Sequence, residues 1–412
     1  MVYVTANCND WLPDCHAKYM KKILINLIKL FQNMRGENIV SVVPCDSYEQ
    51  NKVDNSIREA LKKIDFKIKP NSKILIKPNL VSNNTPEQGS ITHYTLVDSL
   101  CRYFTEKKCR VTIGESSAFY MKNHYTEDAY KTSRIAEIAG KYSVPLVAFE
   151  NEKIISVPKK NLKFLDELYL PEMINDFDLI VDVPKLKTHQ LMRLSGALKN
   201  LYGIVPGGYK QLLHMKTKNI NEFAEVLLDI YENIKPKILS VCDGVIGLDG
   251  GPAAVIGKPK KIGYILASMN PLALDVIACQ IIGYSPEDIT TITAAEKRKM
   301  INVKNVKAVG EFNKTIFEKL QKGSVVDIKK DSILITKTYA LPTVTSKCNL
   351  CGKCITRCPT GALEIKNNKV ELNKEKCIAC YSCAPICPVK AIKLKESKMN
   401  KFITFVRRLF RI

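Results

Sequence analysis

Short apolar runs rich in β-branched residues alternate with segments of helical spacing from residue 39 onward. The run KILIK at Lys73–Lys77 is typical of a buried strand, whereas Val53–Ile64 repeats apolar residues every three or four positions. This alternation predicts an α/β fold, a mostly parallel sheet covered by helices. The predicted strands are Ile39–Val43, Lys73–Lys77, Arg110–Gly114, Pro145–Phe149, Leu179–Val183, Ile238–Cys242 and Ile262–Ala267, and the predicted helices are Val53–Ile64, Thr95–Thr105, Ser133–Lys141, Asn221–Ile230 and Leu272–Ile282.

Lysine, asparagine, acidic residues and histidine recur just after several predicted strands. Ligands of parallel sheets bind at the carboxyl ends of the strands, so these side chains are candidates for one site. Converging ammonium groups would hold a carboxylate or a phosphate, and histidine would carry protons near neutral pH. The alternative is that strand ends are solvated and polar in any protein. The candidate catalytic residues are His93, His189 and Lys185, and the candidate substrate-binding residues are Lys77, Asn79, Glu115, Lys187, Lys199, Asn200 and Asp243.

Four of these residues, Lys77, Lys185, His189 and Asn200, are expected to line one pocket. Lys185 is expected to carry an exposed charge, so that alanine there would weaken ligand binding at little cost in stability. The glycine-rich stretch Gly244–Gly257 has neither Walker spacing nor a strand-linked G-x-G-x-x-G, and an irregular loop explains it equally well. The stretch Leu201–Gly208 predicts either a mobile lid or only a turn.

Eight of the fifteen cysteines fall into two matching runs near the C-terminus, each with the spacing C-x2-C-x2-C-x3-C-P. This is the ligand pattern of bacterial 4Fe-4S clusters, in which the fourth cysteine of a run ligates the other cluster. A zinc ribbon would need two separated pairs and usually histidine, and a disulfide framework would need an oxidising compartment, so both alternatives are weaker. The sequence predicts two 4Fe-4S clusters, one held by Cys348, Cys351, Cys354 and Cys387 and the other by Cys377, Cys380, Cys383 and Cys358.

Predicted strands flank the two cysteine runs. Ala362–Ile365 and Val370–Leu372 predict a hairpin around Asn367-Asn368, and Ala391–Leu394 repeats the first strand. Runs and strands together resemble the bacterial two-cluster ferredoxin domain, over roughly residues 340–396. That resemblance implies a small α+β domain that moves electrons singly.

Ordered motifs in the larger part of the chain resemble one family, the domain of unknown function 362, over roughly residues 38–310. Members of that family often carry a C-terminal ferredoxin module, so the resemblance implies this architecture and marks site positions without implying a settled reaction. The motifs are IKPNL at Ile76–Leu80, Thr92-His93, DVPKLKTH at Asp182–His189, GALKNLYGI at Gly196–Ile204, the loop from Asp243-Gly244 to Gly257, and NPLALD at Asn270–Asp275.

The chain has a formal net charge of +22, spread along its length. Such a charge would suit nucleic acid, an acidic membrane surface or an anionic redox partner. No helix-turn-helix, zinc-finger or RNA-binding signature accompanies it, so the lysines are interpreted as a solvated surface and no specific nucleic-acid binding is expected. The seven remaining cysteines share no spacing and suit a reducing compartment, which indicates a cytoplasmic protein.

Both ends of the chain carry amphipathic segments, although no stretch reaches the length of a membrane span. Tyr19–Phe31 has one apolar helical face and no cleavage site after it, which leaves open a surface anchor, a docking helix or sequence upstream of a start at Met34. Lys398–Ile412 predicts a basic amphipathic helix for an anionic membrane surface, a partner groove or its own domain. Peripheral contact at the inner membrane face is therefore a further expectation.

The predicted organisation is an N-terminal extension (1–37), an α/β domain (38–310), a linker (311–340), a two-cluster ferredoxin domain (341–396) and a basic tail (397–412). The leading interpretation is an oxidoreductase that passes single electrons between two 4Fe-4S clusters and a small anionic substrate in the α/β domain. The alternative is a non-catalytic electron-transfer or accessory protein that docks a partner redox enzyme. An enzyme requires its lysines and histidines to converge within electron-transfer reach of a cluster.

Overall fold

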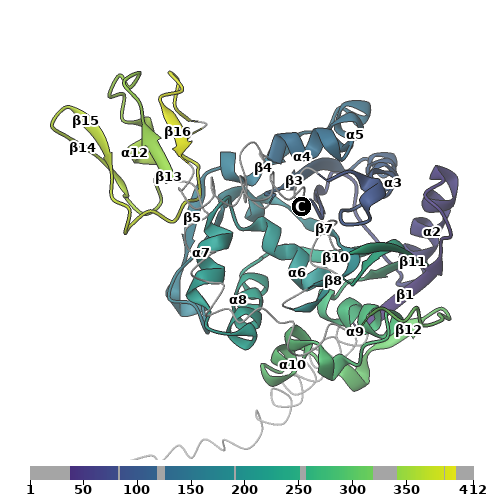
Figure 1. Ribbon diagram of the computed structural model, residues 1–412. Coiled ribbons are helices and arrows are strands. Elements are labelled where there is room, and N and C mark those ends of the chain that lie inside the picture. Colours follow the sequence, from purple (N-terminus) through teal and green to yellow (C-terminus); the bar gives the residue numbers. More distant parts are fainter. Residues whose placement is uncertain are drawn as a thin grey trace, which may run out of the picture.

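The computed structural model describes residues 38–81, 84–117, 126–189, 192–250, 257–318, 341–384 and 386–395. Within these ranges the chain forms a mainly parallel sheet with helices on both faces, followed by a small C-terminal module of short strands (Figure 1). The fold class predicted from the sequence is confirmed. The predicted N-terminal amphipathic segment and the basic tail lie outside the described residues.

The strand order in the large sheet is β12-β1-β11-β10-β7-β2-β3-β4, with β8 paired to β10 and β9 paired to β8. The pairs of β7 with β10 and of β2 with both β7 and β3 are parallel, whereas β11 runs antiparallel to β1 and β10. The strands are β1 Ile39–Pro44, β2 Lys73–Pro78, β3 Arg110–Glu115, β4 Leu146–Ala148, β7 Leu179–Val183, β8 Lys185–His189, β9 Arg193–Ser195, β10 Lys237–Asp249, β11 Lys258–Ser268 and β12 Lys307–Val309.

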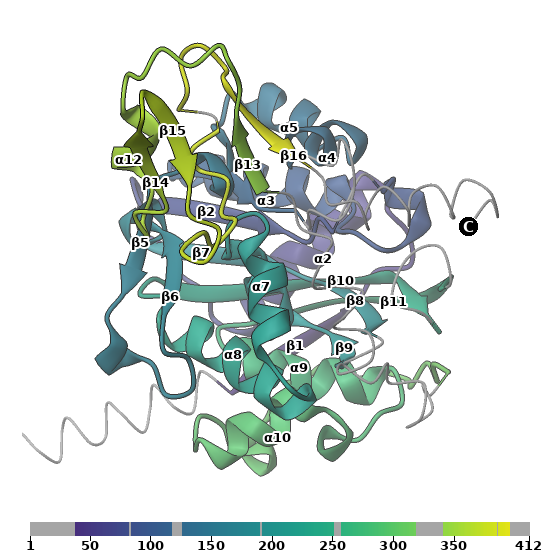
Figure 2. The ribbon, with the colours of Figure 1, turned by 60° about the vertical axis from the view of Figure 1, so that its left-hand side comes forward.

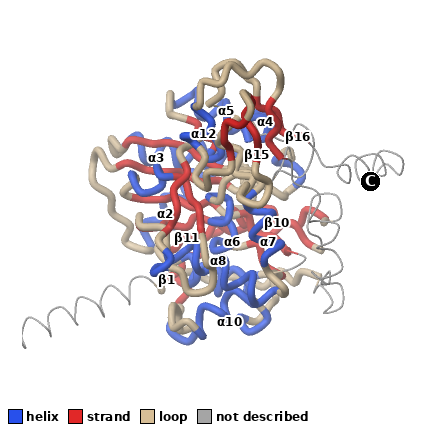
Figure 3. Tube along the Cα trace, turned by 90° about the vertical axis from the view of Figure 1, so that its left-hand side faces the viewer, coloured by secondary structure: helices blue, strands red, loops and turns tan. Residues whose placement is uncertain are grey.

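Helices cover the sheet in two groups (Figures 1 and 3). On one side α2 and α3 pack against the strands, and on the other side α6, α8 and α9 do so, with α10 outside α8 at the end of the molecule opposite the C-terminal module. The helices are α2 Gln50–Lys63, α3 Tyr94–Glu106, α4 Thr126–Thr132, α5 Ile135–Tyr142, α6 Ala197–Asn200, α7 Tyr209–Lys216, α8 Ile220–Glu232, α9 Pro271–Ile281 and α10 Thr290–Lys297.

Burial of both sheet faces explains the continuous apolar runs of the central strands. In β2, Ile74 and Ile76 join the apolar cluster under α2 and α3, while Leu75 between them joins the cluster under α8 and α9. All three side chains are fully buried. Because successive side chains of a strand point to opposite faces, a strand covered on both sides must be apolar at every position. Each such side chain stabilises the fold by about 1.5–3 kcal/mol.

The motif NPLALD has two structural roles that fix the position of α6. Asn270 caps α9, because its side-chain oxygen accepts the backbone N–H of Leu272 at 2.9 Å, and Pro271 occupies the first helical position. Five residues further on, Asp275 accepts the backbone N–H of Ala197 at 2.6 Å at the start of α6. The motif therefore holds the short helix that carries Lys199 and Asn200.

Two stretches predicted to be loops are strands instead. β10 continues to Asp249, well beyond the predicted end at Cys242, with a register shift between Gly244 and Ile246. Residues 244–249 are therefore not an irregular loop. Pairing with β11 holds them as a strand although glycine has a low preference for strands. The chain also resumes as β8 directly after Pro184, since a proline between two strands ends one ladder without preventing the next.

A third difference concerns the helix predicted at Ser133–Lys141. The predicted helix is present as α5, and a helix that was not predicted, α4, precedes it; the two are separated at Ser133-Arg134, where Arg134 adopts a positive φ of 65°. That left-handed residue ends the first helix and lets the second begin in a new direction. The antiparallel pair β5 (Ile154–Val157) and β6 (Leu168–Pro171) was not predicted.

The C-terminal module contains the predicted hairpin. Strands β14 (Leu363–Lys366) and β15 (Lys369–Leu372) are joined by Asn367 and Asn368, whose φ angles of 48° and 56° are those of the favoured two-residue hairpin turn. The predicted strand near Ala391 is present as β16 (Ile392–Lys395), and its partner β13 (Leu341–Val344) was not predicted. A short helix, α12 (Lys353–Arg357), lies between the first cysteines and the hairpin.

The module packs on the α/β domain beside β5 and above α7 (Figure 2). Arg357 donates a hydrogen bond to the carbonyl oxygen of Asn151 at 2.8 Å. Ile378 and Cys380 of the module belong to the main apolar core of the α/β domain. The second cysteine run therefore faces the larger domain.

Candidate functional site

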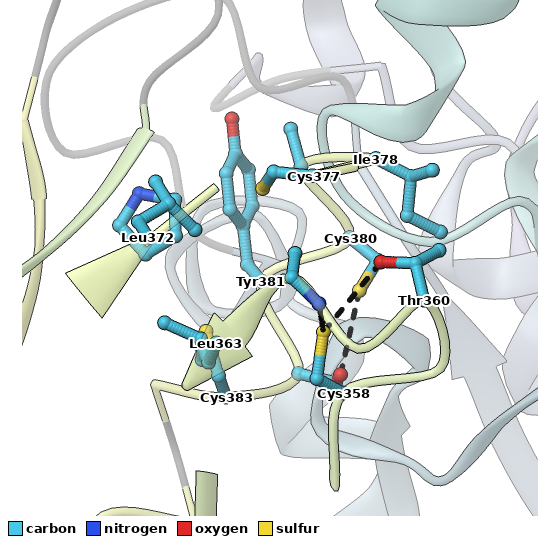
Figure 4. A pocket seen from close by; sticks show the side chains of 13 residues that line it. Cys358, Thr360, Leu363, Leu372, Cys377, Ile378, Cys380, Tyr381 and Cys383 are labelled. Carbon is cyan, nitrogen blue, oxygen red and sulfur yellow. Dashed lines mark hydrogen bonds between the residues drawn. The ribbon is translucent and has the colours of Figure 1, made fainter. Parts of the chain in front are cut away.

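Four cysteines line one pocket in the C-terminal module (Figure 4). Three of them come from the second run, and the fourth is Cys358 from the first run. Apolar side chains of β14 and β15, Leu363 and Leu372, close one side, and Tyr381 lies beside the cysteines. The pocket thus brings together the predicted ligand set Cys358, Cys377, Cys380 and Cys383.

Three cysteines of the other predicted set lie in the apolar cluster of the module, which also includes Cys383. Buried Cys354 packs there with Cys348 and Cys387, and Cys351 is exposed to solvent. Cys387 comes from the second run, so each set combines three cysteines of one run with one of the other. The two sets differ in environment, because Cys351 faces solvent while Cys380 is 8% exposed in the core shared with the α/β domain.

The cysteine sulfurs also receive backbone hydrogen bonds in a repeated pattern. The N–H of Ala362 donates to Cys358 Sγ and the N–H of Ala391 donates to Cys387 Sγ, both at 3.2 Å. N–H donors directed at thiolate sulfur are a means by which proteins tune iron–sulfur clusters. Among the described residues no three cysteine, histidine or acidic side chains could hold a single metal ion. A cubane does not require that convergence, since each thiolate binds a different iron atom.

Burial makes the Cys377 thiol harder to ionise in the absence of iron. It raises the pKa of the Cys377 thiol to about 11, with neighbouring Cys380 and Cys358 adding to the shift. Thiolates are the metal-binding form, so loading of the pocket releases protons. The donor set of this pocket fits an iron–sulfur cluster.

A second polar group lies at the carboxyl ends of β2, β3 and β7. The ammonium of Lys77 pairs with the Glu115 carboxylate at 2.6 Å, and both side chains are buried. Burial raises the pKa of Glu115, and the adjacent Lys77 charge opposes that rise. The pairing follows from the sheet, because β2 and β3 are parallel neighbours whose last residues meet at one edge.

Two asparagines extend this group along the sheet edge. The Asn79 amide nitrogen donates to Asn200 Oδ1 at 2.9 Å, and Asn79 Oδ1 accepts from the ammonium of Lys187 at 3.1 Å. Asn200 in turn donates to Asp182 Oδ1 at 2.8 Å. Burial raises the pKa of Asp182 to about 8 and lowers that of Lys187 to about 7. Asn79, Lys187 and Asn200 are therefore in direct contact, as a common site requires.

Lys185 and Asp243 form a separate ion pair at 2.8 Å on β8 and β10, and both side chains are fully buried. Tyr48 contacts both partners, since its hydroxyl lies 2.6 Å from the Lys185 ammonium and 2.8 Å from Asp243 Oδ1. His93 stacks on the Tyr48 ring at 3.8 Å, and its backbone N–H donates to Asp243 Oδ2 at 3.0 Å. The expectation that Lys185 is exposed is wrong, because its side chain is fully buried with its ammonium against Tyr48 and Asp243.

The candidate histidines are held neutral. Burial lowers the pKa of His93 to about 4 against the opposing effect of Asp243. Burial also lowers the pKa of His189 well below its ordinary value, and nearby Lys199 lowers it further. His189 Nδ1 accepts the N–H of Met192 at 3.2 Å, which leaves its proton on Nε2. His93 therefore lies beside the Lys185–Asp243 ion pair, whereas His189 lies near Lys199.

The segment Gly203–Lys210 connects the sheet edge with the cysteine module. At its start, Gly203 lies against the first ion pair: a Cβ there would be 2.1 Å from Glu115 Oε1 and 2.7 Å from Lys77 Nζ. The Gly203 carbonyl accepts the N–H of Ser116 at 3.1 Å. Only glycine fits at this position.

Four residues later the same segment reaches the module. Gly207 donates its N–H to Ser116 Oγ at 2.9 Å, and a Cβ on Gly207 would lie 2.8 Å from the Cys380 carbonyl oxygen. Its φ of 52° is in the left-handed region that favours glycine. A Cβ on Gly208 would lie 2.4 Å from the Tyr381 hydroxyl. Of the two predicted alternatives for this stretch, the turn is observed, and it packs directly on a cysteine loop.

Further side chains belong to this network without having been singled out in the sequence. Lys210 is buried and donates to Ser116 O at 2.8 Å and to Val205 O at 2.6 Å. No motif marks it, and only its burial distinguishes it from the many surface lysines. Asp182 was part of the DVPKLKTH motif, and the register that pairs it with Lys77 was its available signal. The residues missed are Tyr48, Ser116, Asp182, Lys210 and His214.

An α/β domain joined to a cysteine-rich module of this geometry defines a ferredoxin-linked iron–sulfur protein, and residues 343–388 match a 4Fe-4S dicluster domain. Residues 74–280 match the domain of unknown function DUF362, and the chain belongs to this family. The thylakoid-associated protein sll1697 of Synechocystis is 29% identical over 264 residues, which are 63% of this chain and 78% of that protein. None of the helices in the described ranges has the length and apolar character needed to cross a bilayer.

Proposed function

We propose that this protein is an oxidoreductase that passes single electrons between two 4Fe-4S clusters and a small anionic substrate bound at the sheet edge of the α/β domain. The observation that carries the proposal is the segment Gly203–Lys210, which touches the Lys77–Glu115 pair at one end and the Cys380 loop at the other. Electron transfer needs such short packed connections, and a module merely tethered to the domain would not require them.

The geometry of the eight cysteines supports the crossed ligand sets. Cys358 would complete the set of the second run, and Cys387 would complete the set of the first. When bound, the clusters would supply one-electron chemistry, with potentials adjusted by the N–H donors of Ala362 and Ala391. The exposed Cys351 supports exchange with an external partner at the first set, and the buried Cys380 supports exchange with the α/β domain at the second.

Within the α/β domain, the pKa directions favour Lys187 as the group that exchanges a proton. Its pKa of about 7 suits acid–base work at neutral pH, whereas His93, at about 4, stays neutral there and would donate or accept only hydrogen bonds. Lys77 and Lys185 are committed to their acid partners and would position the site. Asn79 and Asn200 lie beside Lys187 and would orient a substrate oxygen.

The proposal is tested by a single-turnover experiment on anaerobically isolated protein. The small molecule that co-purifies would be released, identified by mass spectrometry, and added back to protein whose clusters have been reduced. We expect the clusters to be reoxidised and the molecule to be converted. Visible absorbance measures the reoxidation. Gly207→Val is the matched variant, because its side chain would press on the backbone of Cys380 and displace the turn without replacing any cysteine thiol. It should slow reoxidation with cluster content preserved.

The accessory function remains the second candidate, and one observation favours it. The lysine–acid pairs at the sheet edge satisfy one another, as in a structural core. If the molecule binds but the reduced clusters persist in the wild-type protein, electron transfer to a docked redox enzyme becomes the better explanation. Rapid reoxidation by a redox protein with no small-molecule conversion would support the same conclusion.

We expect the anaerobically isolated protein to contain about eight iron atoms and about eight acid-labile sulfides per chain, because two complete cubanes need that stoichiometry. Metal analysis together with a sulfide assay measures both quantities. About two zinc ions per chain without sulfide would contradict the cluster assignment.

The basic tail, residues 398–412, is proposed to bind anionic bilayers from the cytoplasmic side. Each lysine or arginine near such a surface contributes on the order of 1 kcal/mol, and inserted phenylalanines add to this. The thylakoid association of the Synechocystis relative supports a membrane-proximal location. Deleting residues 398–412 should abolish salt-sensitive co-sedimentation with anionic vesicles and leave the iron content unchanged. Equal co-sedimentation of truncated and full-length protein would contradict this.

A further inference from the structure

Lys187 and Lys199 are among the lysines of the α/β domain that form no ion pair within the described residues. Within the described residues the Lys199 ammonium makes no hydrogen bond or ion pair, and it lies over the face of the Tyr202 ring, 5.7 Å from the ring centre. Lys187, which is 3% exposed, donates only to neutral acceptors, Asn79 Oδ1 at 3.1 Å and Ser90 O at 2.5 Å. By contrast, Lys77 and Lys185 each have a carboxylate.

The surroundings of Lys199 are basic and partly open. His189 on β8 and His214 on α7 lie close enough for the Lys199 charge to lower the pKa of both rings. Lys199, His189 and His214 are each partly exposed, whereas Lys187 behind them is buried. His214 is fixed by its ring contacts, stacked on Phe223 at 3.9 Å. These three partly exposed residues therefore mark where solvent approaches the buried Lys187.

An uncompensated buried ammonium costs several kcal/mol unless it loses its proton or gains an anion. The pKa of Lys199 is lowered to about 8, mainly by burial and to a smaller extent by repulsion from Lys77. The pKa of Lys187 is lowered to about 7, mainly by burial and to a smaller extent by repulsion from Lys199 and Lys185. The acids nearest these groups, Glu115, Asp182 and Asp243, are engaged by Lys77, Asn200 and Lys185.

We propose that Lys199, Lys187, His189 and His214 form an oxyanion-binding site, in which the two ammonium groups and the ring N–H groups hold a carboxylate or phosphate of a small ligand. His214 had no assigned role, and this inference deepens the proposed function by locating the anionic group of its substrate. The ligand lies beside Asn79, which contacts Lys187, and Lys77 lies between the site and the Gly203–Lys210 segment that leads to the module.

The site predicts a coupling between anion binding and proton uptake. A bound anion raises the pKa of both lysines, so the complex holds more protons than the free protein near pH 7 to 8. Affinity is therefore highest at low pH and falls as the pH rises through the free-protein pKa values. The titratable groups that face the two lysines are the cations Lys77 and Lys185 and the neutral rings of His189 and His214, so no neighbouring acid reverses this direction.

Sulfate is the probe that tests this site, because its charge stays constant over the relevant pH range. Isothermal titration of the full protein with oxidised clusters, at constant ionic strength, should show sulfate affinity falling about tenfold or more from about pH 7 to about pH 9. Buffers of different ionisation enthalpy should report net proton uptake at pH 7 to 8. Succinate and phosphate, used as competitors, identify whether a carboxylate or a phosphate fits better.

Three variants separate this site from a general effect of positive charge. Lys199→Met should weaken sulfate binding about tenfold or more, since it removes one of the two ammonium groups that hold the anion. Lys199→Arg should retain binding and lose part of the pH dependence, because a guanidinium does not titrate in this range. Lys237→Met removes an exposed charge at the first residue of β10 and should leave binding unchanged.

The inference is overturned if wild-type protein takes up no sulfate, if affinity is independent of pH, or if Lys199→Met and Lys237→Met behave alike. Circular dichroism and iron content show whether each variant has folded. Sulfate is redox-inert, so the outcome is independent of electron transfer. Sulfate binding without substrate-driven reoxidation would refute the proposed reaction and support the site. Substrate-driven reoxidation without sulfate binding would support the proposed reaction and refute the site.

Discussion

Serine in place of Cys358 is expected to disrupt the cluster of the second cysteine run, although Cys358 belongs to the first run. Its sulfur shares a pocket with those of Cys377, Cys380 and Cys383. Replacing a thiolate by a hydroxyl removes the fourth soft ligand of that cubane, and iron should fall from about eight toward about four atoms per chain. Electron paramagnetic resonance of the reduced protein distinguishes the two clusters.

Cys109→Ser is the matched control for this experiment. Cys109 is also a largely buried thiol, but it lies in the α/β domain, where its sulfur contacts the Lys69 carbonyl oxygen at 3.6 Å. The control should retain both spectroscopic signals. A loss confined to the cluster of Cys348, Cys351 and Cys354 would show that the crossed ligation is wrong and that each run holds its own cluster.

Methionine in place of Lys185 is expected to destabilise the protein by about 3–5 kcal/mol, because it leaves the fully buried Asp243 carboxylate without its counter-charge. A side chain that had been exposed would cost only about 0.5 kcal/mol. Urea unfolding of anaerobic protein, followed by circular dichroism, measures the change in the unfolding midpoint.

The double variant Lys185→Met/Asp243→Asn provides the contrast. It removes both charges and keeps an amide that can accept the N–H of His93, so its stability should exceed that of Lys185→Met alone. Lys237→Met, at the exposed start of β10, should unfold like the wild-type protein. If Lys185→Met unfolds at the same urea concentration as Lys237→Met, the buried pair contributes little and the stabilising role assigned to it is wrong.

The central strands could be predicted because burial on both faces leaves a signal in every residue. Leu179–Val183 was predicted with the bounds it has, and Lys73–Lys77 differs only by the final proline. The second half of β10 could not be predicted in this way. Its glycines at 244 and 247 indicate a loop by local preference, and only pairing with β11 makes it a strand.

The contacts among the candidate residues could not be predicted from the sequence. The rule that strand ends meet at one edge brought Lys77, Asn79, Lys187 and Asn200 into one neighbourhood. Which lysine has an acid partner depends on contacts between residues that are distant in sequence, such as the 58 positions between Lys185 and Asp243. The cysteine spacing is more informative because cluster ligation constrains it directly.

The pairing of β1 with β11 has a consequence for synthesis of the chain. Ser41 lies opposite Ala267, a separation of 226 residues, and the other neighbour of β1 is β12, which comes later still. At roughly 5–20 residues per second, the ribosome needs roughly 10–45 s to make the residues that cover this strand. During that interval IVSVVP is an apolar segment with unpaired backbone groups, a form prone to aggregation. The nascent chain is therefore expected to depend on chaperones until β11 has emerged.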